Sequence, residues 1–79
     1  MFDEHKIRKY TEWLERQAVE SAEEFLCDHF EVESIYELSQ EQIRDVLEFK
    51  HRMNIYDPMS YGFMEVIYNW QNENEIDLL

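Results

Sequence analysis

The sequence predicts an all-α fold, a small three- or four-helix bundle with a long N-terminal helix and a flexible C-terminal tail. The chain has 79 residues, a length at which one small hydrophobic core forms. Glycine and proline occur once each, as Gly62 and Pro58, so few residues interrupt a helix. Apolar residues recur every three or four positions along most of the chain, which is typical of amphipathic helices. We expect a helical domain over residues 1–72 and an interaction tail over residues 73–79.

The first helix is predicted to cover residues 3–30. Its apolar residues follow the helical period and are expected to share one face. They are Ile7, Tyr10, Leu14, Ala18, Ala22, Phe25, Leu26 and Phe30. The next segment, residues 32–38, fits either a short helix or an extended connector.

The second helix is predicted to begin at a capping box. The Ser39 hydroxyl would accept a hydrogen bond from the Gln42 amide, and the Gln42 side chain would reach back. The inward-facing residues of this helix are expected to be Ile43, Val46, Leu47 and Met53. Residues 54–58 end it, because proline disfavours helix at the residue before it and suits the first turn of a new helix. Asp57 is therefore the expected N-cap of a third helix that runs to about residue 70 or 72.

The third helix has more apolar surface than one core needs. One face carries Met59, Phe63, Val66, Ile67 and Trp70. A second stripe, roughly opposite, carries Tyr61, Met64 and Tyr68. A helix that is apolar on both sides is either central in its own bundle or docked on a partner. The docking hypothesis assigns Tyr61, Met64, Tyr68 and Trp70 to the partner surface.

Charge is distributed very unevenly. The net charge is −12, yet residues 1–16 balance Asp3, Glu4, Glu12 and Glu15 against Lys6, Arg8, Lys9 and Arg16. Residues 17–43 hold acids and no base. Such a chain repels nucleic acid as a whole, so we expect a protein partner with a basic surface and no sequence-specific DNA binding. Any contact with a DNA backbone is confined to the four bases of the first segment.

Residues that could carry chemistry are scattered. His5, His29 and His51 lie far apart, and Cys27 has no second ligand pair at metal spacing. No glycine-rich loop or nucleophile motif accompanies the carboxylates. We therefore expect no enzymatic activity, no metal and no cofactor. A single cysteine and the absence of a signal peptide or membrane span indicate a cytoplasmic protein.

The last residues are unusual for a chain end, because aliphatic side chains alternate with acids over Ile76, Asp77, Leu78 and Leu79. They either fold back onto the core or form a short motif that enters a hydrophobic groove on another protein.

This acidic-hydrophobic ending after a small acidic helical body resembles the late-transcription co-activators (late promoter transcription accessory proteins) of T-even-type phages. The family tail reads aliphatic, acid, aromatic and two leucines. Ile76, Asp77, Leu78 and Leu79 match all of it except the aromatic. The resemblance implies a body that binds the β-subunit flap of host RNA polymerase and a tail that binds the sliding clamp. The protein would then act in the host cell cytoplasm, as a bridge for late transcription.

Two other functions fit the same sequence. The acid-only run of residues 17–43 is typical of an inhibitor that mimics DNA and blocks a nucleic-acid-binding groove. The second alternative is a structural homodimer that forms through the third helix. Mimicry needs these acids, whereas a bridge needs Leu78 and Leu79.

Overall fold

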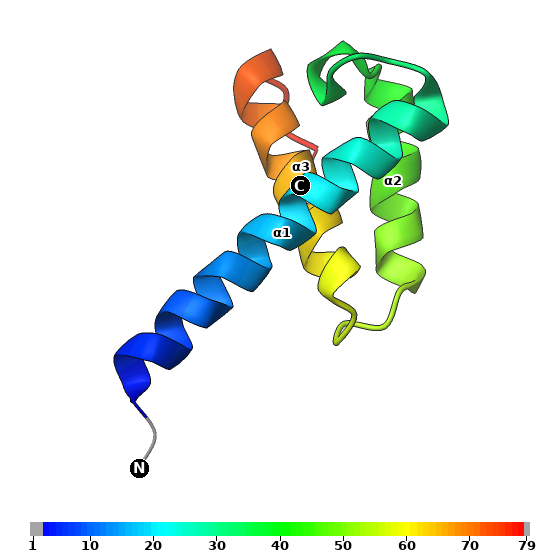
Figure 1. The fold of residues 1–79 in the computed structure, drawn as a ribbon. Coiled ribbons are helices and arrows are strands. Elements are labelled where there is room, and N and C mark those ends of the chain that lie inside the picture. Colours follow the sequence, from blue (N-terminus) through cyan, green and yellow to red (C-terminus); the bar gives the residue numbers. More distant parts are fainter. Residues whose placement is uncertain (1–2, 79) are drawn as a thin grey trace.

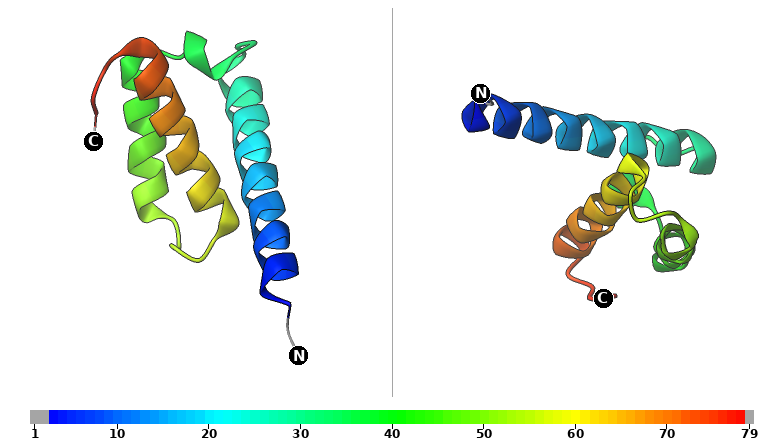
Figure 2. Two further views of the ribbon diagram at one scale, coloured as in Figure 1. Left: turned by 90° about the vertical axis from the view of Figure 1, so that its left-hand side faces the viewer. Right: turned by 90° about the horizontal axis from the view of Figure 1, so that it is seen from below.

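The computed structural model describes residues 3–78 and confirms the all-α class with its long first helix. Helix α1 covers Glu4–Phe30, the short 3₁₀ helix η1 covers Ile35–Glu37, α2 covers Gln40–Arg52 and α3 covers Pro58–Asn74 (Figure 1). Helix α3 is central, since its backbone lies close to α1, α2 and η1, whereas the backbones of α1 and α2 do not approach each other closely within the described residues. Figure 2 shows α3 lying between the other two helices.

The predicted caps are confirmed. The Ser39 hydroxyl accepts from the Gln42 amide at 3.1 Å, and Gln42 Oε1 accepts from the Ser39 amide at 2.8 Å. The Asp57 carboxylate accepts from the Met59 amide at 2.9 Å and caps α3, with proline in the first turn. These motifs fix where α2 and α3 begin, because each satisfies backbone donors that the first helical turn leaves unpaired.

The core lies where α1, α2, η1 and α3 meet. Its buried members are Ala22, Leu26, Ile35, Leu38, Ile43, Val46, Phe63, Val66, Ile67 and Trp70. The ambiguous segment 32–38 contains one 3₁₀ turn, Ile35–Glu37, between non-helical residues, and it buries Ile35 and Leu38. Of the residues expected to face inward from the second helix, Ile43 and Val46 are buried, and Leu47 and Met53 pack partly buried against them.

The expected core face of the first helix is wrong over its first half. Ile7, Tyr10 and Leu14 are exposed, because α1 runs beyond the end of α3 and no other element covers its first turns (Figures 1 and 2). We call residues 4–16 the arm. Within the described residues, Ala18 is the first residue of α1 that is buried. Phe25, although it contacts Phe63, is also half exposed.

The C-terminal residues up to Leu78 lie against the helical body. The boundary expected between residues 72 and 73 falls inside α3, which ends at Asn74 with Glu75 in the left-handed conformation. The Ile76 amide donates to the Gln71 carbonyl at 3.2 Å, and the Leu78 amide donates to Gln71 Oε1 at 2.8 Å. Ile76 and Leu78 pack partly buried against the core. Residues 75–78 thus fold back onto the core and do not extend from the body as a free motif.

Candidate functional site

An open acidic groove lies between α1 and α3. It has a volume of about 520 Å³. The acidic groove is lined by Glu12, Glu15, Arg16, Val19, Glu20, Glu23, Tyr61 and Glu65. Five of these eight residues are carboxylates, and they come from two helices far apart in the chain. The acidic groove is therefore a product of tertiary packing.

Close packing of the helices places the α3 residues in this groove. Ala18 and Ala22 are buried on α1, and a side chain added at Gly62 of α3 would overlap the carbonyl oxygen of Ala18. Because small residues meet there, the helix axes approach closely. Tyr61 and Glu65 lie four residues apart on α3, so both reach the groove from successive turns.

The groove is electrostatically suited to a cation. Partial burial, followed by the negative charges of Glu65 and Glu15, raises the pKa of Tyr61 above its ordinary value. Tyr61 thus stays a neutral phenol beside carboxylates that repel one another. A lysine or arginine side chain would relieve that repulsion and could lie against the Tyr61 ring. The groove has no grouping for a metal, since within residues 3–78 no three His, Cys, Asp or Glu side chains gather closely enough to hold an ion.

The structure separates the residues that the docking hypothesis assigned to the third helix. Tyr61 is 41% exposed and lines the acidic groove. Tyr68 is 44% exposed two turns further along α3, and Met64 between them is partly buried. The assignment of Trp70 to the surface is wrong. Its side chain is 2% exposed and its indole nitrogen donates to the Leu38 carbonyl oxygen at 3.0 Å, so it belongs to the core.

The tail residues predicted to bind a clamp do not form an extended motif. Ile76 and Leu78 lie against the core, and Asp77 between them is exposed. Leu79 lies outside the described residues. An aliphatic groove on a partner could receive Ile76 and Leu78 only after they leave their contacts with the body.

The four bases predicted to touch a DNA backbone are all exposed on the arm. Arg16 lines the acidic groove. Arg8 lines a neighbouring hollow with Glu4, Glu12 and Glu15. These two arginines therefore lie among carboxylates, which reduces the positive field they present to a phosphate. Lys6 and Lys9 line neither hollow.

Sequence reasoning missed an aromatic groove on the other side of the α1–α3 contact. It has a volume of about 190 Å³ and its walls are mostly apolar. The Phe63 ring makes edge-to-face contacts in it with Phe25 and with Phe49, and in both contacts the ring centroids are 6.0 Å apart. Phe49 follows Val46 by three residues, so helical spacing was the signal that could have placed it beside the core.

No family model, curated protein or solved structure matches the chain. Among the described residues, no helix is both long enough and apolar enough to span a membrane.

Proposed function

We propose that this protein is a non-enzymatic binding module that attaches to a basic surface of a partner protein through the acidic groove. The observation that carries the proposal is the convergence of Glu12, Glu15, Glu20 and Glu23 from α1 with Glu65 from α3 around Tyr61. A net charge of −12 steers the protein toward basic surfaces. An aromatic ring among carboxylates then provides the contact that a lysine- or arginine-rich segment needs.

The partners are proposed from the family that the tail resembles. The body would bind the flap of the RNA polymerase β subunit and the tail would bind a sliding clamp, in the cytoplasm of the host cell. A bridge of this kind makes clamp capture intramolecular and raises its effective concentration. Because Ile76 and Leu78 pack against the body, the tail would bind the clamp in competition with its own core. Clamp binding by this protein alone would therefore be weak.

The bridge is tested with purified components. RNA polymerase, sliding clamp and this protein are mixed in pairs and together, and complexes are separated by size-exclusion chromatography. The proposal predicts that the protein co-elutes with polymerase and that clamp joins the complex only when this protein is present. Removing residues 76–79 should release the clamp and leave polymerase binding intact.

A matched control separates loss of the tail from loss of the fold. Ile76→Ala with Leu78→Ala removes the aliphatic side chains and keeps the chain length. Helix content of both variants is measured by circular dichroism before binding is compared. If clamp still co-elutes with either folded variant, the tail is not the clamp-binding element. If the unchanged protein does not bind polymerase, the helical body is not a polymerase-binding domain.

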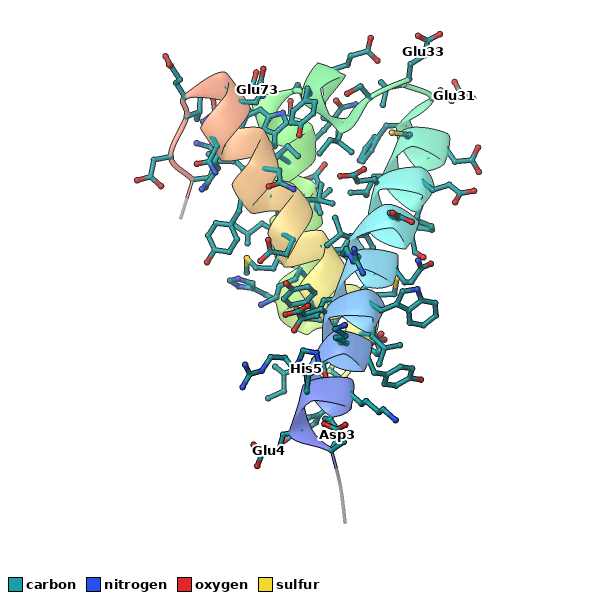
Figure 3. The ribbon with its side chains drawn as sticks, turned by 60° about the vertical axis from the view of Figure 1, so that its left-hand side comes forward. Asp3, Glu4, His5, Glu31, Glu33 and Glu73 are labelled. Carbon is teal, nitrogen blue, oxygen red and sulfur yellow. The ribbon has the colours of Figure 1, made fainter. Side chains whose placement is uncertain are left out.

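A second candidate, DNA mimicry, is supported by an acidic stripe that shares only Glu20 with the acidic groove. Glu20, Glu24 and Asp28 are exposed and follow one another at single-turn intervals of about 6 Å along α1. Glu31 and Glu33 extend the negative charge past the end of the helix (Figure 3). A row of regularly spaced anions is what a nucleic-acid-binding groove attracts.

The two candidates differ in which acids they need. Mimicry requires Glu24, Asp28 and Glu31, none of which lines the acidic groove. Changing these three to the neutral amides should abolish inhibition of a DNA-binding protein under mimicry. The same change should leave polymerase binding nearly unaffected if the acidic groove is the binding site.

A further inference from the structure

The outer face of α1 combines charge and aromatic groups in a fixed order. This face is defined by Lys6, Tyr10, Trp13, Gln17, Glu20 and Glu24. The residues follow alternating intervals of four and three, so they form one continuous stripe. All six are exposed, and the rings of Tyr10 and Trp13 stack with centroids 6.0 Å apart. Tyr10 is 61% exposed and Trp13 is 47% exposed.

The aromatic part of this face lies on the arm, whose first turns extend beyond the bundle in both views of Figure 2. Asp3 caps the arm by accepting from the His5 amide at 3.0 Å, and every residue of the arm is exposed. Helix α3 lies beside the arm only at the acidic groove, through Glu12, Glu15 and Arg16. Figure 3 shows Asp3, Glu4 and His5 at its free end. An uncovered helical segment of this length is marginally stable alone. Burial of the exposed aromatic and aliphatic side chains would stabilise it.

The order of charges makes the outer face complementary to itself. Lys6 lies at its N-terminal end, Tyr10 and Trp13 in the middle, and Glu20 and Glu24 toward the C-terminal end. Two copies placed antiparallel would put the base of each beside the acids of the other and the aromatic rings between them. A parallel pair would oppose like charges at both ends.

We propose that a second copy of this chain covers the outer face, forming an antiparallel, two-fold symmetric dimer through α1. The arm, with Glu4, Glu12 and Glu15 against Lys6, Arg8, Lys9 and Arg16, is close to neutral, whereas most of the net charge of −12 belongs to the body. Antiparallel arms keep the two acidic bodies at opposite ends of the interface. The helix macrodipoles also oppose one another in this arrangement.

The size of the face predicts a weak dimer. The arm is 13 residues long, or roughly 20 Å. Two such segments bury less surface than the interfaces of stable dimers. The charge pairs lie at the rim, so dimerisation becomes weaker as salt rises. The dimer does not need the tail, and of the residues that define the outer face only Glu20 also lines the acidic groove. Lys6→Glu with Lys9→Glu leaves that groove unchanged, so the two proposals fail separately.

The test is a charge exchange followed by mass measurement in solution. One variant carries Lys6→Glu and Lys9→Glu, and the other carries Glu20→Lys and Glu24→Lys. Each is measured alone and in equimolar mixture by sedimentation equilibrium at low salt, over a range of concentrations. Every changed residue is exposed, so helix content should match that of the unchanged protein. Glu33→Lys with Glu73→Lys is the control, since both acids are exposed outside the outer face.

The proposal predicts that the unchanged protein and the control approach twice 9.8 kDa as concentration rises. Each exchange variant alone should have a dissociation constant raised about tenfold or more, and the mixture should recover dimerisation. A mass that stays at 9.8 kDa for the unchanged protein overturns the proposal. So does a mixture that remains monomeric. If the unchanged protein is monomeric and the Lys6/Lys9 variant loses polymerase binding, the face belongs to that partner instead.

Discussion

The indole nitrogen of Trp70 donates a hydrogen bond of 3.0 Å to the carbonyl oxygen of Leu38, linking α3 to the turn before α2. Both side chains are buried, and the residues are 32 positions apart in the sequence. The bond satisfies the single polar group of the Trp70 side chain. It also satisfies the backbone carbonyl of Leu38, the residue directly before the α2 capping box. This hydrogen bond therefore holds the turn before α2 against α3.

Removing this hydrogen bond should destabilise the fold. Trp70→Phe leaves the Leu38 carbonyl without its indole donor and removes part of a buried ring, so unfolding free energy should fall by about 1–3 kcal/mol. Urea denaturation followed by circular dichroism measures the change. Trp13→Phe is the matched control, because Trp13 is 47% exposed and its loss should cost about 0.5 kcal/mol or less. Equal costs for the two changes would refute the core assignment of Trp70.

Gly62 should resist the substitution that usually stabilises a helix. Alanine is about 1 kcal/mol better than glycine inside a helix. At this position the added Cβ would lie 3.1 Å from the Ala22 Cβ and would overlap backbone of Ala18, which cannot move without shifting α1. Gly62→Ala should therefore lower unfolding free energy by about 1–3 kcal/mol. A thermal melt showing a stabilised variant would mean that α1 and α3 are further apart than described.

The folded-back tail should contribute to stability. Ile76 is partly buried against the core, so Ile76→Ala should cost about 1–2 kcal/mol. Ile55 is 77% exposed, and Ile55→Ala provides the same chemical change with almost no expected cost. Both are measured by urea denaturation. If the Ile76 variant is as stable as the Ile55 variant, the tail does not contribute to the core, and the prediction of a flexible tail is supported.

Cys27 should make stability depend on alkaline pH. Burial, and then the charges of Glu23 and Glu37, raise the pKa of its thiol. The unfolded chain therefore loses this proton at lower pH than the folded chain, and folding stability falls as pH rises above the ordinary pKa of a thiol, about 8.5. Cys27→Ala removes this term, so its unfolding free energy should fall less steeply over the same range. The raised pKa of Tyr61 also lowers folding stability, but at higher pH. This effect is the same in the unchanged protein and in the Cys27→Ala variant, so it does not alter the comparison.

Local motifs were predictable because their hydrogen bonds join residues two to four positions apart. The capping box of Ser39 and Gln42 and the Asp57 cap before Pro58 are examples. Ser34 and Glu37 form a second capping box, with the Glu37 carboxylate accepting from the Ser34 amide at 3.2 Å. That motif has the same spacing, yet its turn is only three residues long, so periodicity could not identify it.

Properties set by distant contacts were not predictable in the same way. Tyr10 and Ala18 share the helical period of the first helix, but α3 reaches only the second of them. Trp70 fits a docking surface by composition, and its burial depends on Leu38. The acidic groove requires Gly62 to bring α3 against α1, a contact between residues more than forty positions apart.

The most direct test of the binding proposal is the affinity of the acidic groove for RNA polymerase. Glu15, Glu23 and Glu65 are changed together to glutamine, and binding to purified polymerase is measured by calorimetry. The control changes Glu24, Glu31 and Glu33, which have the same charge and lie outside the groove. We predict that the groove variant binds at least about tenfold more weakly while the control binds like the unchanged protein. Equal affinities for the two variants would contradict the account.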